Sequence, residues 1–76
     1  MRLTPEQINI LQEELCAELV NILMQEWHYS MHEALGVLYN SDTFALIQDV
    51  GTGLYYQSAG YVYSYLEEEL NTEKVA

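Results

Sequence analysis

Between Leu3 and Glu73 this chain contains neither lysine nor arginine, and its two basic residues, Arg2 and Lys74, stand at its ends. The same 76 residues include twelve Asp and Glu, which gives a formal net charge of −10, and half of all residues are apolar. Few ion pairs can form, and the acids repel one another, which opposes compaction and favours solubility. A packed apolar core must therefore hold the fold together.

The length allows one domain at most. A domain of this size buries only about 60% of its unfolded surface, so disulfides, metals or self-association commonly add stability. Cys16 is the single cysteine, which excludes an internal disulfide and the class of secreted disulfide scaffolds. No stretch resembles a signal peptide or reaches the roughly 20 apolar residues of a membrane span. We expect a cytoplasmic protein that does not enter a membrane.

A long first helix is predicted from Pro5 to about Trp27. Thr4 can cap it, Pro5 suits the first helical position, and Gln7 completes a capping box. At about 100° per residue, the apolar side chains fall on one half of the circumference, which is wider than packing on a single helix requires. The residues of this half are Ile8, Leu11, Leu15, Cys16, Leu19, Val20, Ile22, Leu23 and Trp27.

Three shorter helices are predicted after the first. Ser30 begins a second capping box for a helix from about Met31 to residues 39–40. Ser41 or Asp42 caps a third, and Ser58 caps a fourth from about residue 59 to residue 70. Residues 51–53 form a turn, residues 54–56 are too short for a strand, and residues 71–76 form a frayed tail. The predicted fold is all-α, a small helical bundle in one domain over residues 1–76.

No catalytic, cofactor-binding or metal site is predicted, and we expect that the protein is not an enzyme. His28 and His32 have the i, i+4 spacing of zinc ligands, but Ser30 should break the helix between them. Cys16 has no nearby cation to activate it, and the sequence 51–53 lacks the companion glycines and lysine of a phosphate loop. The absence of internal Lys and Arg also argues against direct nucleic-acid binding.

Glu26 departs from the pattern, because it falls within the apolar half of the first helix. Two alternatives are open: a buried, hydrogen-bonded carboxylate, or one that reaches solvent at the edge of the core. Neither alternative requires catalysis.

Tyrosines supply the candidate interaction residues, since all seven follow His28. Tyrosine is enriched at interfaces because it buries area while keeping a polar tip. The alternative is that the tyrosines only lie at the edge of the core. Tyr55 and Tyr56 are adjacent, so they cannot both face the core. The candidate interaction residues are Tyr55, Tyr56, Tyr63, Trp27, Glu67 and Glu68.

Three segments, Leu38–Phe44, Thr52–Ser58 and Tyr61–Val62–Tyr63, carry the sequences LYNSDTF, TGLYYQS and YVY. This pattern, over about the last two-thirds of the chain, resembles the DUF3791-like families of small bacterial proteins, although the Leu-His-Thr element of that family is missing. The resemblance implies a short helical bacterial protein, encoded beside toxin-like genes. It implies no activity, cofactor or catalytic residue.

Composition and pattern together predict a small acidic protein–protein interaction module. The wide apolar half of the first helix favours self-association as a homodimer or homo-oligomer. The alternative is an acidic inhibitor or antitoxin-like protein that occupies a basic surface, such as a toxin or a nucleic-acid-binding groove. No cofactor is expected in either case.

Overall fold

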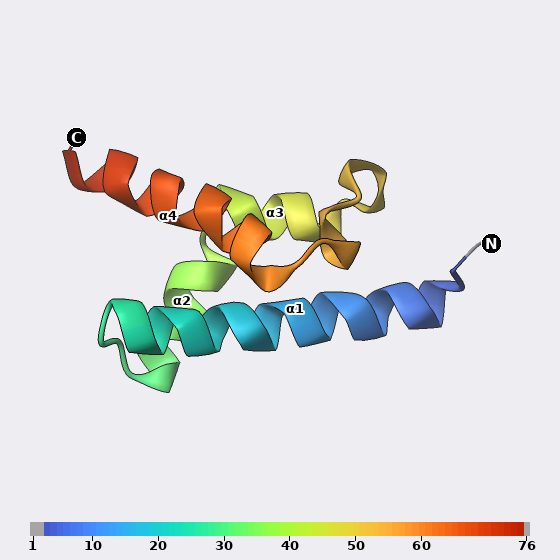
Figure 1. Cartoon of the computed structure of the whole chain (residues 1–76), viewed down its shortest axis with the longest axis horizontal. Helices are drawn as coiled ribbons and strands as arrows, with labels where there is room; N and C mark the ends of the chain where they lie inside the picture. Colours follow the sequence, from blue (N-terminus) through green and yellow to red (C-terminus); the bar gives the residue numbers. More distant parts are fainter. Residues whose placement is uncertain (1–2, 76) are drawn as a thin grey trace.

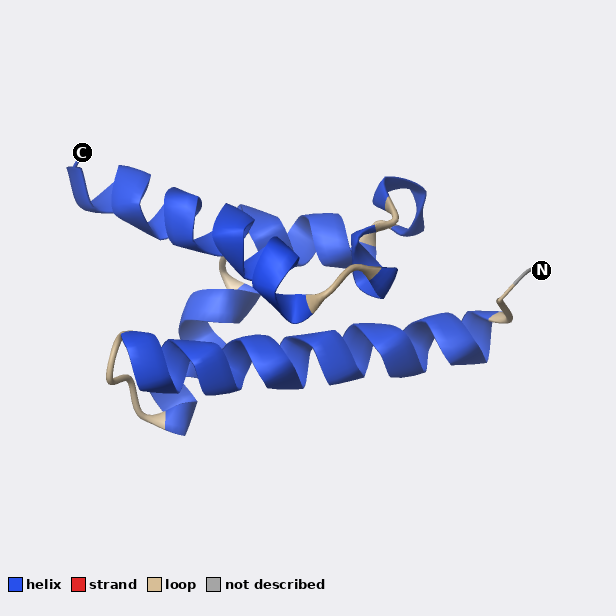
Figure 2. Cartoon of the chain, in the orientation of Figure 1, coloured by secondary structure: helices blue, strands red, loops and turns tan. Residues whose placement is uncertain are grey.

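The computed structural model describes the backbone of residues 3–75 and the side chains of residues 3–72. Every regular element in this part of the chain is helical (Figure 2), which confirms the all-α prediction. The elements are α1 (Pro5–Glu26), α2 (Met31–Tyr39), α3 (Asp42–Gln48), the 3₁₀ turns η1 (Val50–Thr52) and η2 (Leu54–Tyr56), and α4 (Ala59–Val75).

The long helix α1 forms one side of the molecule, and α3 and α4 form the other (Figure 1). Helix α2 passes from the end of α1 towards α3, and the two 3₁₀ turns lead the chain back to α4. The wide apolar half of α1 is largely covered by other parts of the same chain, because α2, η2 and α4 all pack on it.

The predicted caps are present at the start of each helix. Thr4 and Ser30 form complete capping boxes with Gln7 and Glu33. Ser41, rather than Asp42, caps α3 by accepting a hydrogen bond from the backbone N–H of Phe44 at 3.0 Å, and the hydroxyl of Ser58 accepts one from the N–H of Tyr61 at 3.3 Å. Each helix therefore starts where a local side chain satisfies an otherwise unpaired amide.

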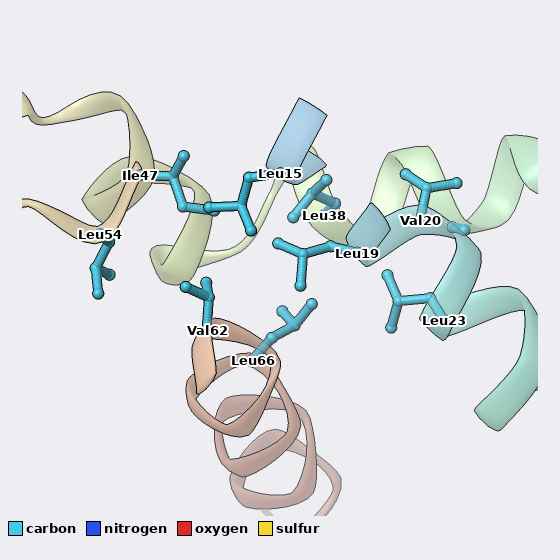
Figure 3. Close-up of a cluster of buried hydrophobic side chains, with 10 residues drawn as sticks. Leu15, Leu19, Val20, Leu23, Leu38, Ile47, Leu54, Val62 and Leu66 are labelled. Atoms are coloured by element: carbon cyan, nitrogen blue, oxygen red, sulfur yellow. The ribbon is translucent and has the colours of Figure 1, made fainter. Parts of the chain in front are cut away.

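Ten apolar side chains form the buried core (Figure 3). Leu19 and Leu23 of α1 and Val62 and Leu66 of α4 have no exposed surface, as expected of two helices packed by their apolar stripes. The ten are Leu15, Leu19, Val20, Leu23, Ala34, Leu38, Ile47, Leu54, Val62 and Leu66.

The short helix α3 is bound at both ends by side chains from other helices. At its start, the carboxylate of Glu69 on α4 accepts hydrogen bonds from the N–H of Asp42 at 2.7 Å and from the N–H and hydroxyl of Thr43 at 3.0 and 2.8 Å. At its end, the buried amide of Gln12 on α1 donates to the carbonyl oxygens of Ile47 at 3.0 Å and Gln48 at 3.4 Å. These bonds satisfy helix-terminal groups that seven residues cannot pair internally.

The last helix is longer than predicted. We expected it to end near Leu70 and to be followed by a frayed tail, but α4 continues to Val75. No glycine or proline follows Gly60 to end the helix, and the hydroxyl of Thr72 donates to the carbonyl oxygen of Glu68 at 2.8 Å within it. Ala76, the last residue of the predicted tail, lies outside the described residues.

Replacing Glu69 with alanine should destabilise the fold by about 1–3 kcal/mol, because the buried hydroxyl and amide of Thr43 lose their acceptor. Glu68→Ala is the matched control, since it removes an exposed carboxylate from the same helix and should change stability by about 0.5 kcal/mol or less. Urea unfolding followed by circular dichroism measures both. Equal losses in the two variants would show that the bonds to α3 contribute nothing.

The end of α1 stores backbone strain at His28, whose φ of +59° is in the left-handed region. This position normally suits glycine, because a Cβ atom costs about 1–2 kcal/mol there. We expect His28→Gly to raise the free energy of unfolding by about 0.5–1 kcal/mol. Gln25→Gly, one turn earlier and inside the helix, should lower it by about the same amount. A loss of stability in both variants would contradict this assignment of strain.

Candidate functional site

A groove of about 570 Å³ runs beside α1, where that helix meets α2 and α3. Helix α1 supplies six of its ten lining residues, and α2 and α3 supply two each. We call this the α1 groove; its lining residues are Asn9, Gln12, Glu13, Cys16, Ala17, Val20, Leu35, Tyr39, Phe44 and Gln48.

The wall opposite α1 is aromatic. The rings of Tyr39 and Phe44 meet edge to face with centroids 5.0 Å apart, and Tyr39 is 55% exposed. Phe44 is held in place through α3, whose last carbonyls bind the Gln12 amide. Glu13 supplies the one carboxylate of the lining. Such a groove suits an apolar side chain or helix better than an anion or a polar metabolite.

Cys16 lies half-buried in the α1 groove, and burial raises the pKa of its thiol above the ordinary value. No lysine, arginine or histidine is among the lining residues, so nothing there stabilises a thiolate. The thiol stays protonated at neutral pH and contributes to the groove as a small apolar group.

One edge of the groove continues into an apolar stripe on the outer side of α1. Its members, Ile10, Ala17 and Met24, are seven residues apart and therefore share one face of the helix. Ile10 is 54% exposed, Ala17 is exposed and Met24 is half-buried. We call this set the α1 stripe. Ile10 and Ala17 lie on the exposed side of α1 together with Glu13, Glu14 and Glu18, whereas Met24 also packs against the core.

Trp27 and Tyr63, two predicted interaction residues, are brought together across 36 positions of sequence. The indole N–H of Trp27 donates to the hydroxyl oxygen of Tyr63 at 3.0 Å, and the ring of Trp27 stacks on Tyr29 at 6.0 Å. Burial raises the pKa of Tyr63, and the carboxylates of Glu67 and Glu26 raise it further. Both side chains are half-buried and pack against the edge of the core, with part of each exposed to solvent.

Tyr55 and Tyr56 lie elsewhere, on η2, with ring centroids 5.1 Å apart. Tyr55 is half-buried and Tyr56 is 61% exposed, as expected if both cannot face the core. They line a shallow groove of about 190 Å³ with the segment of α1 that includes Leu11 and Glu18, well before Trp27.

The carboxylates of Glu67 and Glu68 are exposed on different faces of α4. The charge of Glu67 contributes to the raised pKa of Tyr63. The pKa of Tyr65 is raised mainly by its hydrogen bond to Tyr61, and the charge of Glu68 raises it further. Of the six predicted interaction residues, Trp27, Tyr63 and Glu67 therefore lie close together, whereas Tyr55 and Tyr56 lie on η2 and Glu68 lies on another face of α4.

Glu26, His28 and His32 were the other residues that the sequence singled out, and all three lie near the end of α1 or the start of α2. Glu26 is exposed, so the second of its two alternatives holds: the carboxylate reaches solvent where α1 ends. His28 precedes the cap at Ser30 and His32 follows it, so the two histidines are not on one continuous helix. Among the side chains of residues 3–72, no three of His, Cys, Asp or Glu gather as metal ligands would. No helix in that range is long and apolar enough to cross a membrane.

Sequence reasoning missed the residues that build the groove. Gln12 was not identified, because nothing in its local sequence marks a polar side chain that will cap a helix 35 residues later. Tyr39 and Phe44 were assigned to separate short helices, and their contact depends on the turn between those helices. The seven-residue spacing of Ile10, Ala17 and Met24 is visible in the sequence, and it indicates the α1 stripe that borders the groove at Ala17.

No family model, curated protein or solved structure matches the chain. The resemblance of its last two-thirds to the DUF3791-like proteins therefore stays a prediction.

We expect Tyr63→Phe to destabilise the protein by about 0.5–1.5 kcal/mol, because the partly buried N–H of Trp27 loses the hydroxyl that accepts its hydrogen bond. Tyr61→Phe is the control on the same helix. It removes an exposed hydroxyl bonded at 2.9 Å to that of Tyr65, and its effect should be near zero. Urea unfolding monitored by Trp27 fluorescence separates the two, and similar effects in both would contradict a structural role for the Trp27–Tyr63 bond.

Proposed function

We propose that this protein is a small acidic protein–protein interaction module that self-associates through its first helix. The observation that carries the proposal is the α1 stripe beside the α1 groove: the exposed apolar side chains of Ile10 and Ala17, with the half-buried Met24 in line with them, next to an aromatic-walled hollow. Exposed apolar surface of this kind marks interaction sites in small domains. A second copy would supply the partner helix.

Charge limits how a second helix can approach this surface. At about 100° per residue, Glu18 lies about 100° around α1 from Ala17 and Glu14 about 60° from it, so Glu18 stays in solvent while Glu14 borders the contact. The contact must therefore keep the carboxylates of the two copies apart.

A second candidate function draws on the acidic exterior. Glu13, Glu14, Glu18, Glu67 and Glu68 are all exposed, and no lysine or arginine stands between Leu3 and Glu73 to neutralise them. A protein of this charge would associate rapidly with a basic surface. This is the behaviour of an acidic inhibitor or antitoxin-like protein, and it uses the exposed carboxylates of α1 and α4 rather than the apolar side chains of the α1 stripe.

Light scattering over a range of protein concentrations tests self-association, and a pair of variants locates it. Ala17→Glu and Gln25→Glu add the same charge to α1, but only the first places it on the α1 stripe. We expect Ala17→Glu to weaken dimerisation by at least about tenfold, since like charges would meet at the interface. Gln25→Glu should dimerise like the unmodified protein. A strict monomer at high concentration would exclude the proposal.

The salt dependence separates the two candidate functions. Self-association should strengthen as salt is added, because the Debye length falls from about 10 Å at 0.1 M to about 3 Å at 1 M and repulsion between the acidic copies is screened. Capture of a basic partner should weaken over the same range. Self-association that weakened with salt would contradict an apolar α1 interface.

A further inference from the structure

We propose that two copies pair through α1 in antiparallel orientation, about a two-fold axis that passes beside Ala17. This inference rests on the proposed self-association and specifies its geometry. A two-fold interface uses the same patch on both copies, so that residue i of one copy meets residue j of the other, and j meets i. Ala17, at the middle of the α1 stripe, is small enough for two helix backbones to approach closely there.

The positions of the apolar side chains favour this register. Ile10 lies seven residues before Ala17 and Met24 lies seven residues after it. In an antiparallel pair centred on Ala17, Ile10 of each copy therefore packs against Met24 of the other. The two large side chains are buried together, and the small one occupies the crossing point, as in ridges-into-grooves packing of helices.

The positions of the charges favour the same orientation. Glu6 and Glu13 lie on the face of α1 that carries the stripe, at about 100° per residue. In the antiparallel register centred on Ala17, Glu13 meets the partner's Asn21, and Glu6 approaches the end of the partner helix that carries His28. In a parallel pair, Glu6 and Glu13 would each meet their own copy, and opposed carboxylates are unfavourable.

The α1 groove gives the pairing room. Tyr39 and Phe44 stand along one side of α1, so the partner helix lies against the stripe with one flank in the hollow in front of these rings. Aromatic side chains at such a position bury large area at little entropic cost. A single helix pair covers less than the about 800 Å² per partner of a standard interface, so a dissociation constant in the micromolar range is expected.

Cysteine cross-linking tests the register. Ile10→Cys and Met24→Cys are each made in a Cys16→Ser background, one is labelled with ¹⁵N, and the two are mixed in equal amounts and oxidised with copper phenanthroline. Mass spectrometry then distinguishes the mixed disulfide from each homodimeric one. Gln25→Cys, about a quarter turn around α1 from Ala17, is the control for random collision, and light scattering on the Cys16→Ser protein measures its dimerisation.

We expect the mixed Ile10→Cys and Met24→Cys disulfide in about tenfold excess over either homodimeric product, which corresponds to a preference of about 1.4 kcal/mol. Excess of the homodimeric products would establish a parallel pair and overturn the proposal. Dimerisation without any disulfide above the Gln25→Cys control would overturn the register while leaving self-association intact. A monomer by light scattering, again without specific disulfides, would overturn both the register and the proposed function.

Discussion

Helix α3 has only seven residues, and its two ends are fixed by side chains that come from opposite sides of the molecule. Helices this short are not stable on their own in water, so the Glu69 carboxylate on α4 and the Gln12 amide on α1 stabilise it from outside. The same bonds tie α1 to α4 through α3. Since Phe44 and Gln48 of α3 form the far wall of the α1 groove, the candidate site depends on these bonds for its shape.

The structure also shows how an acidic chain almost without cations finds partners for its carboxylates. Three of them accept hydrogen bonds from backbone amides: Glu33 from Ser30, Glu69 from Asp42 and Thr43, and Asp49 from Gly51. The bonds to Ser30 hold the pKa of Glu33 below its usual value. Amides at helix starts carry partial positive charge, so they take the place that lysine and arginine side chains hold in most proteins.

The parts of the fold that could be predicted are those in which cause and effect lie close in the sequence. The caps at Thr4, Ser30, Ser41 and Ser58 each act within three residues, and they located the start of every helix. The bonds of Gln12 and Glu69 span 35 and 26 or more residues, and no local pattern encodes them. The α1 groove follows from such long-range contacts, which explains why it could not be predicted from the sequence. The expectation of self-association rested on the wide apolar half of the first helix, and α2, η2 and α4 pack on that half within the chain.

The two proposed functions place different demands on the same charge. A net charge of −10 opposes any contact between copies, so an interface on α1 must leave Glu14 and Glu18 in water and keep Glu6 and Glu13 away from their counterparts. An antiparallel pair centred on Ala17 meets the second demand, and it leaves the acidic face of α4 free in both copies. Pairing would then double the charge presented to a basic partner. The two proposed functions would therefore be compatible in one molecule if a basic partner were to bind the carboxylates of α4, such as Glu67 and Glu68.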